Sequence, residues 1–291
     1  LKYEGNYPNK SKYVYVSSVK DTITYLNNNG TIRVNAASAS LPALGSGSYN
    51  GGFENGTNGV AGFDALGNIV ATSGVSTPYN FYEKISSTNS QGFLLDSTAT
   101  AKGGKSYMDA LNLLSNADEY DINLLLLPGI VDNIGTGHAG IITKAIDVAE
   151  NRGDCFVIYD AVDYDTTNIS TVTTKVGERD SNYAATYWPW VQTTDNGQMR
   201  WVPPSTVLSG IYSFNDKIAA PWFAPAGLNR GGLDTVIQAS RKLTHSNRDD
   251  LYESNVNPIA TFPGQGVCVW GQKTLQKKSS ALDRVNVRRL M

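Results

Sequence analysis

The sequence has few charged residues and no long hydrophobic run, and both scarcities exclude classes of function. Asp, Glu, Lys and Arg make up 17% of the 291 residues, which is below the usual quarter, so neutral polar groups must solvate most of the surface. The formal net charge of −2 gives no global basic field for nucleic acid or an anionic membrane. The longest apolar stretch, Leu124–Leu127, stops at Pro128 and is far too short to cross a bilayer. We therefore expect neither nucleic-acid binding nor membrane insertion.

Cysteine and histidine are also scarce, with two residues of each type. Cys155 and Cys268 lie inside apolar, strand-like runs, which favours two small core residues over a disulfide or a metal pair and indicates folding in a reducing compartment. His138 stands near a predicted helix start, where we expect a surface position. A hydrolytic triad needs a nucleophile on a sharp turn, and no Gly-x-Ser-x-Gly occurs. The sequence therefore predicts no catalytic residue.

Two short motifs could hold a ligand, and a structural role is favoured for both. Gly103–Ser106 is similar to part of a P-loop, but Ala99 stands where that motif requires glycine and no buried strand precedes it. Asp160, Asp163 and Asp165 follow a predicted strand, where α/β sheets tend to bind ligands, yet the run lacks the glycine and the downstream glutamate of an EF-hand. A solvated acidic loop is favoured over a divalent-cation site. We predict no cofactor-binding residue, no metal-binding residue and no cofactor.

A cluster of aromatic residues could stack sugars or bases, and its members are Tyr187, Trp188, Trp190 and Trp201. Lys and Arg are not interleaved with them, so the pattern supports nucleic-acid binding only weakly. We expect these side chains to serve the core or a subunit interface.

Sequence patterns divide the chain into residues 1–100, which are rich in Tyr, Gly, Ser and Asn, and residues 101–291. Alternating runs at 13–16 and 22–25 predict strands, so the first region should be β-rich. In the second region, an apolar strand at 122–127, a helix with apolar residues at helical spacing over 141–149 and a strand at 155–159 form a βαβ unit, with Gly153 ending the helix. Its strands should be parallel. The fold class is therefore α/β, a mixed sheet with flanking helices.

The end of the chain predicts two more strands. Residues 266–271 form a short apolar run between Gly266 and Gly271, as in a buried strand of the same sheet. Trp270 should then be largely buried, and Trp270→Ala should cost about 3–5 kcal/mol. Val285 and Val287 alternate with polar residues, as in a strand with one face inward.

Helix signals occur at several other places. Ser106 with Asp109 and Ser246 with Asp249 have the spacing of capping pairs. A short helix should run from the prolines at 203–204 through residue 212, and a turn at 225–231 should lead into a helix through residue 237. Pro189 interrupts the aromatic strand at 183–191, which predicts that this strand lies at a sheet edge.

Several of these segments occur together in one known family. The motifs, in chain order, are Pro128-Gly129, Ala149–Asp154, Pro203-Pro204-Ser205, Pro225–Gly231, Asn257-Pro258-Ile259, Gly266–Leu275 and Asp283–Leu290. In this order they closely resemble the signature of the tail sheath proteins of contractile-tailed bacteriophages, the T4-like myovirus sheath family. The resemblance covers about residues 104–291, whereas residues 1–100 match no motif.

The resemblance implies a structural subunit and no enzyme. Sheath proteins polymerise helically around the tail tube, meet the baseplate and tail terminator proteins, and contract to drive the tube through the host envelope, which makes them virion components built in the host cytoplasm. It also implies a longer protein, so we expect the sequence to be a trimmed or protease-resistant fragment. The alternatives are the sheath of a contractile bacteriocin or secretion apparatus, a cofactor-free α/β hydrolase, and a carbohydrate-binding module built on residues 1–100.

Overall fold

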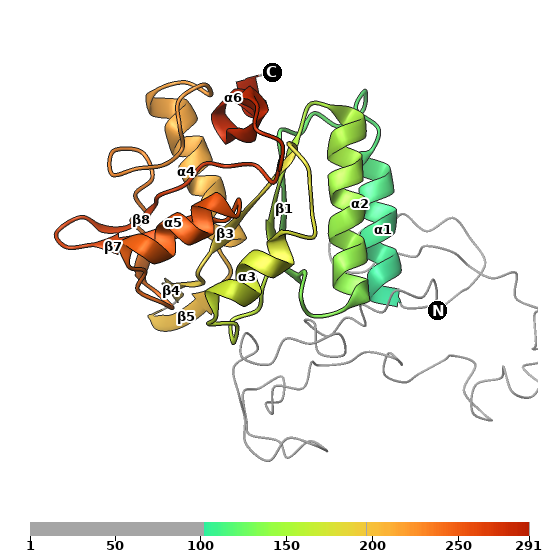
Figure 1. Ribbon diagram of the computed structural model, residues 1–291. Helices are drawn as coiled ribbons and strands as arrows, with labels where there is room; N and C mark the ends of the chain where they lie inside the picture. Colours follow the sequence, from blue (N-terminus) through green and yellow to red (C-terminus); the bar gives the residue numbers. More distant parts are fainter. Residues whose placement is uncertain (1–101, 196, 291) are drawn as a thin grey trace, which may run out of the picture. The chain divides into compact units, whose positions relative to one another are not determined.

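A five-stranded sheet is the centre of the computed structural model, which describes residues 102–195 and 197–290 (Figure 1). The strands lie in the order β1-β2-β3-β7-β8, and their bounds are Leu124–Val131, Phe156–Asp160, Ala184–Trp188, Asn257–Phe262 and Gly266–Val269. The first four pair in parallel and β8 is antiparallel to β7. The predicted mixed α/β sheet is thus confirmed, and the strands expected at 122–127, 155–159 and 266–271 lie in it together. The expected β-rich region, residues 1–100, lies outside the described residues.

The βαβ unit forms as the sequence predicts. Helix α2, Thr136–Arg152, buries Ile141, Ile142 and Ala145 on one side and connects β1 to the parallel strand β2. Gly153 ends the helix in the left-handed conformation, with φ 80°, and donates its backbone N–H to the carbonyl of Ala149 at 2.9 Å. Glycine adopts this conformation without the strain that a side chain would add.

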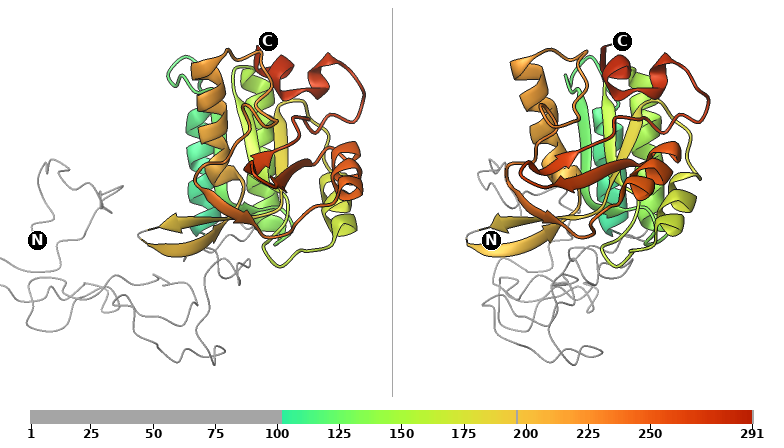
Figure 2. Two further views of the ribbon diagram at one scale, coloured as in Figure 1. Left: turned by 90° about the vertical axis from the view of Figure 1, so that its left-hand side faces the viewer. Right: turned by 60° about the vertical axis from the view of Figure 1, so that its left-hand side comes forward.

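Alternate residues of β2 pack into two separate hydrophobic cores, because successive side chains of a strand point to opposite faces of the sheet. Val157 and Tyr159 pack with α1 (Lys102–Leu114), α2, α3 (Ile169–Val176) and α5 (His245–Glu253). Phe156 and Ile158 pack on the opposite face against α4, Ser205–Ile218. Figures 1 and 2 show α1 beside α2, and α4 on the face opposite α3 and α5.

A second, smaller antiparallel sheet has the order β5-β4-β6, with bounds Gln198–Val202, Val191–Asp195 and Val236–Ala239. The β4–β5 hairpin extends beyond the helices in Figure 2. The strand expected at 183–191 is therefore two strands, and β3 lies between β2 and β7 instead of at a sheet edge. The prediction was wrong because Pro189 follows the last residue of β3 and interrupts no ladder.

The turn at 225–231 leads into β6 and not into the expected helix through residue 237. Gly231 accepts the N–H of Val269 at 2.8 Å, and Gly227 and Leu233 donate to the carbonyls of Val269 and Val267 at 2.8 and 2.9 Å. These hydrogen bonds hold the segment along the outer edge of β8, so the segment cannot form a helix. A Cβ at Gly231 would lie 2.6 Å from the carbonyl oxygen of Val269, which no side chain could tolerate.

Two helix starts and one helix end differ from the sequence expectation. Helix α1 begins at Lys102, so Ser106 lies inside it. Thr244, and not Ser246, caps α5 by accepting the N–H of Asn247 at 3.3 Å. Helix α4 does start at Ser205 but runs beyond Tyr212 to Ile218.

The final segment is helical. The short 3₁₀ turn η3, Ala281–Asp283, precedes α6, Val285–Leu290, where a strand was expected. Val285 is fully buried and Val287 only partly so, which means that the alternation of two valines did not mark a strand.

The prediction that Trp270 is largely buried was wrong, since β8 ends at Val269 and Trp270 is 42% exposed. Its ring packs on that of Phe262 with 4.7 Å between centroids.

Trp190 and Trp270 make a matched pair for a stability test. Trp190 is 1% exposed and its indole N–H donates to the carbonyl of Val162 at 2.9 Å. Trp190→Ala should lower the free energy of unfolding by about 3–5 kcal/mol, the usual cost of emptying a large buried aromatic site. Trp270→Ala should cost clearly less, because the solvated ring fills no core site. Urea denaturation of the two variants measures both values, and equal losses would contradict the burial described here.

Candidate functional site

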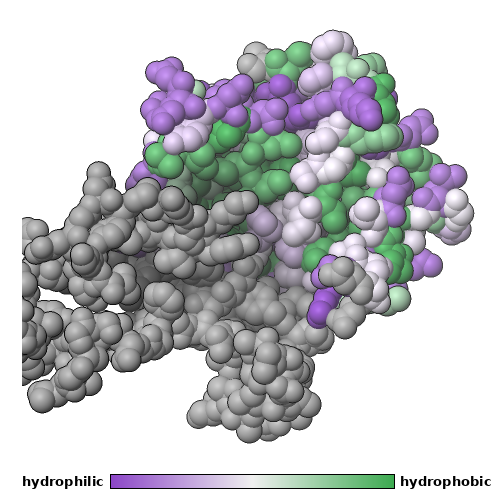
Figure 3. All heavy atoms as spheres, turned by 180° about the vertical axis from the view of Figure 1, so that it is seen from behind, coloured by the Kyte–Doolittle hydropathy of each residue, from purple (hydrophilic) through white to green (hydrophobic). Residues whose placement is uncertain are grey.

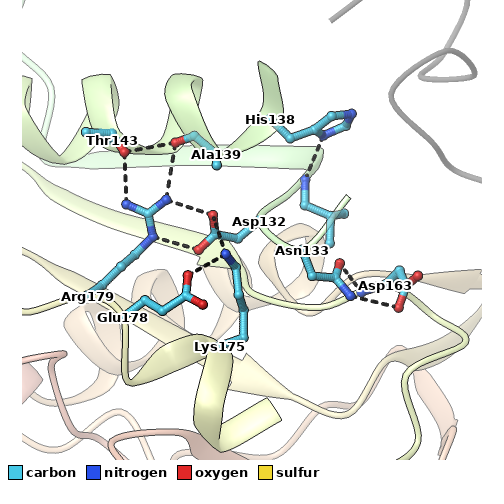
Figure 4. A network of polar contacts seen from close by, with 10 residues as sticks. Asp132, Asn133, His138, Ala139, Thr143, Asp163, Lys175, Glu178 and Arg179 are labelled. Carbon is cyan, nitrogen blue, oxygen red and sulfur yellow. Dashed lines mark hydrogen bonds and ion pairs between the residues drawn. The ribbon is translucent and has the colours of Figure 1, made fainter. Parts of the chain in front are cut away.

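A buried ion pair lies where β1 and β2 end at the start of α2 (Figure 4). The Asp132 carboxylate is fully buried and accepts two hydrogen bonds from Arg179, at 2.6 Å from Nε and 2.7 Å from Nη2. The same guanidinium donates to the carbonyl of Ala139 at 3.2 Å and to the hydroxyl of Thr143 at 3.1 Å, both in α2. Lys175 of α3 adds a second cation 3.9 Å from Asp132. This Asp132–Arg179 pair therefore ties β1, α2 and the end of α3 together.

The loops after β1 and β2 are joined beside this pair. Asn133 donates its side-chain amide to Asp163 at 3.2 Å and accepts the backbone N–H of Asp163 at 3.0 Å. His138 is fully buried, where a surface position was expected, and its Nδ1 accepts the N–H of Val131 at 3.1 Å. The expectation was wrong because His138 lies in the first turn of α2 and faces the end of β1 (Figure 4).

Asp160 forms a second buried contact, between β2 and the first residue of α4. Its carboxylate accepts the Ser205 backbone N–H at 3.1 Å and the Ser205 hydroxyl at 2.6 Å. Burial raises the pKa of Asp160 to about 7, against the opposing effect of these two hydrogen bonds. Asp160 therefore satisfies the backbone N–H of Ser205 at the start of α4, as a capping carboxylate does.

The acidic residues at the end of β2 point to different partners. Asp160 is hydrogen-bonded to Ser205, Asp163 is hydrogen-bonded to Asn133, and Asp165 is exposed. The expected solvated loop is therefore correct for Asp165 and wrong for Asp160. Within the described part of the chain, no group of three or more His, Cys, Asp or Glu residues could hold a metal ion.

The other residues singled out in the sequence have structural positions. Gly103–Ser106 lies within α1, so it is helical and does not form a phosphate loop. Cys155 and Cys268 are buried and unpaired, as predicted, and burial raises the pKa of both thiols. His245 starts α5 at the surface, 2.7 Å from Asp249.

Three of the four clustered aromatic residues belong to the core, as expected. Tyr187, Trp188 and Trp190 are buried, and the hydroxyls of Tyr187 and Tyr212 lie 2.6 Å apart. Trp201 is partly exposed and packs on Tyr164 with 5.4 Å between ring centroids.

Arg152 is a residue whose role sequence reasoning missed. Its side chain is 1% exposed and donates to the carbonyls of Leu114 and Tyr120 at 2.5 and 2.7 Å, and to both carboxylate oxygens of Asp154. It thereby ties the end of α1 to the end of α2. The signal was its place in the Ala149–Asp154 motif, because an arginine just before a helix-ending glycine can reach several carbonyls.

Residues 103–275, more than half of the chain, match the family described as the phage tail sheath protein central domain. The chain belongs to the phage tail sheath family. The matched range spans every element from α1 to β8, including both buried carboxylate contacts, and leaves η3 and α6 outside. In the described residues, no helix is long and apolar enough to cross a membrane.

Sheath proteins of T4-like phages are among its relatives. The tail sheath protein of Vibrio phage KVP40 is 37% identical over 126 residues, which is 43% of this chain and 18% of that protein. The tail sheath protein of Enterobacteria phage T4 is 26% identical over 215 residues, or 67% of this chain and 32% of that protein. The chain therefore spans less than a third of the length of either relative.

A solved sheath shares the fold. The helical sheath of the anti-feeding prophage, in its contracted state, aligns with a TM-score of 0.50 and 25% identity over 66% of this chain and 49% of that one. The family is structural, and its phage members are virion components.

Arg179→Ala should lower the free energy of unfolding by about 3–5 kcal/mol, because it leaves the Asp132 carboxylate buried without its partner. Lys175→Ala is the matched control, since it removes a partly exposed cation from the same carboxylate and should cost less than about 1 kcal/mol. Urea denaturation measures both losses. Similar losses for the two variants would show that the Asp132–Arg179 pair is not the dominant contact.

Asp160 should make stability depend on pH. Its pKa is about 7 in the folded protein, whereas an aspartate in an unfolded chain titrates near pH 4. Between these values the folded state holds a proton that the unfolded state has lost, so this contribution to stability falls as the pH rises from about 4 to 7.

Asp160→Asn should remove that contribution and reduce the slope of unfolding free energy against pH by up to about 1.4 kcal/mol per unit. Ser205→Ala should instead extend to higher pH the range over which stability falls, because it deletes a hydrogen bond that lowers the Asp160 pKa. Denaturation at a series of pH values measures the slopes. An Asp160→Asn slope equal to that of the wild type would refute this assignment.

Proposed function

We propose that the protein is a structural subunit of a contractile phage tail sheath. In this proposal it polymerises helically around the tail tube, contacts the baseplate and tail terminator proteins, and contracts to drive the tube through the host envelope. The single observation that carries the proposal is the match of residues 103–275 to the sheath central domain. Residues 101–291 then form the sheath core domain and residues 1–100 a separate β-rich region, with assembly into the virion in the host cytoplasm.

The core is suited to a subunit that must move as a rigid body. A contractile lattice changes the packing between subunits while each subunit keeps its fold. Here helices cover both faces of the sheet, and the Asp132–Arg179 and Asp160–Ser205 contacts lock loops to helices at its carboxyl end. Such a core can keep its fold while the packing around it changes.

The surface on the α4 side has the character of an assembly contact. Seen from behind, Figure 3 shows hydrophobic residues gathered in a broad area bordered by hydrophilic ones. Large apolar side chains are exposed along the second half of α4 and in the loop after it, namely Phe214, Ile218, Trp222, Phe223 and Leu228. Monomeric proteins rarely expose large contiguous apolar patches, so contact with a neighbouring protein is the expected use of this surface.

The proposal includes no catalysis and no cofactor, because contraction of the sheath is driven by changes of packing between subunits. The curated relatives are phage proteins, which favours a phage tail over an injection device. The hydrolase alternative gains no support from the sites described above, and the carbohydrate-binding alternative concerns residues 1–100, which lie outside the described residues.

Electron microscopy of the complete gene product that carries this sequence tests the proposal. We expect tubular polymers with helical order. Only monomers or closed rings, over a range of salt and protein concentration, would contradict it.

A double variant tests the α4 surface in the same protein. Phe214→Asp with Ile218→Asp should abolish tubes and leave the thermal midpoint nearly unchanged, because the two side chains are 48% and 51% exposed. Lys217→Asp, between them on the same helix, is the charge control and should still form tubes. Normal tubes from the double variant would exclude this surface from the assembly contact.

A further inference from the structure

Helix α6 lies across the end of the sheet at which β1 and β2 begin (Figure 1). A cavity of about 290 Å³, partly open to solvent, lies beside it. The cavity is lined by the start of β2 with Cys155, by Asp216 of α4 and by Arg288, Arg289 and Leu290 of α6. The far end of α6 is therefore not packed tightly onto the body of the fold.

Polar side chains make most of the contacts that hold α6. Arg289 donates to both carboxylate oxygens of Asp216, at 3.1 and 2.5 Å, and its guanidinium lies 4.8 Å from the ring centroid of Tyr212. Arg288 lies 3.5 Å from the ring centroid of Tyr183 and donates to the carbonyl of Gly153 at 3.3 Å.

Apolar packing contributes little to the docking of α6. Of its six residues only Val285 is buried, and Val285 lies at its first position, where its N–H donates to the carbonyl of Gln272 at 2.9 Å. Leu290, at the other end, is 56% exposed. An isolated helix of this length is not stable in water, so α6 depends on its docking contacts. Its far end depends chiefly on the two arginines.

These features give α6 a low cost of local opening. Segments that bury few apolar contacts open with free energies far below that of global unfolding. The space under α6 already lacks the close contacts that resist separation in a packed core. Turning about Val285 would break the arginine contacts and leave the sheet and the Asp132–Arg179 pair intact, since that pair lies at the opposite end of the strands.

We propose that α6 is a releasable latch, pivoting at Val285 and held closed by the Arg289–Asp216 ion pair, that opens to widen the cavity and expose the residues at the start of β2. This goes beyond the proposed function, since it concerns one subunit and needs no polymer. In the open state the end of the sheet that α6 covers becomes accessible to solvent.

The two cysteines make the latch measurable. Cys155 lines the cavity and is 4% exposed, whereas Cys268 lies in β8 away from the cavity and is 1% exposed. A maleimide reagent can label Cys155 when α6 opens, but it reaches Cys268 only when the sheet itself unfolds. Variants Cys268→Ala and Cys155→Ala of the 291-residue chain assign each labelling rate to one thiol.

In native buffer we expect slow labelling of Cys155 that depends little on urea, and much slower labelling of Cys268 that depends strongly on urea. A small urea dependence is the mark of an opening that exposes little surface. Arg289→Ala should accelerate Cys155 labelling about tenfold or more, and Asp216→Ala should do the same, because each removes one side of a charge-assisted pair. The double variant should be no faster than either single variant.

Lys217→Ala is the matched control, since Lys217 is the exposed neighbour of Asp216 in α4. Neither it nor the latch variants should alter the Cys268 rate. The proposal is overturned if Cys155 and Cys268 label at one common rate, if Arg289→Ala leaves the Cys155 rate unchanged, or if Cys155 of the unaltered protein reacts as fast as a free thiol. A failed polymer in the microscopy experiment would leave this result standing, so the two proposals fail separately.

Discussion

The complete burial of β2 is the constraint on which the rest of the fold depends. All five of its residues are buried, so both faces of the strand must be covered and each of its backbone groups must find a partner. Parallel strands on both sides form hydrogen bonds with the backbone of β2, and helices on both faces cover its side chains in two hydrophobic cores. The loops at its carboxyl end are then closed in, which is why they use Asp132, Asp160 and Arg179 in fully paired contacts instead of leaving them to water.

The sequence predicted what local periodicity determines. The βαβ unit was found because the apolar spacing of α2, the runs of β1 and β2 and the stop at Gly153 are all local signals. The errors arose where a distant segment decides the outcome. Residues 231–233 bond to β8 and so cannot be helical, His138 faces the end of β1, and Val285 is buried by packing that no alternation pattern reports. The two buried carboxylate contacts join residues more than forty positions apart, and no spacing rule reveals such pairs.

The motifs that carried the family resemblance have physical roles in the structure. Arg152 and Gly153 close the end of α2, Ser205 meets the buried Asp160, and Gly231 permits a close approach to β8. Asn257 adds another such role, because its side chain donates to the carbonyls of Thr186 and Lys273 at 3.1 and 2.8 Å and accepts the N–H of Lys273 at 2.6 Å. The motifs thus mark places where a side chain pairs with backbone groups, or where only glycine fits the backbone.

The segment that Gly231 holds along β8 has a consequence for the newly made protein. An open sheet edge is a template on which identical chains can stack while they are still newly made. Residues 227–233 occupy one edge of the main sheet, while on the other edge the exposed Pro128 of β1 interrupts the row of backbone donors. The two edges of the sheet are thus protected by different means, which disfavours edge-to-edge stacking of identical chains.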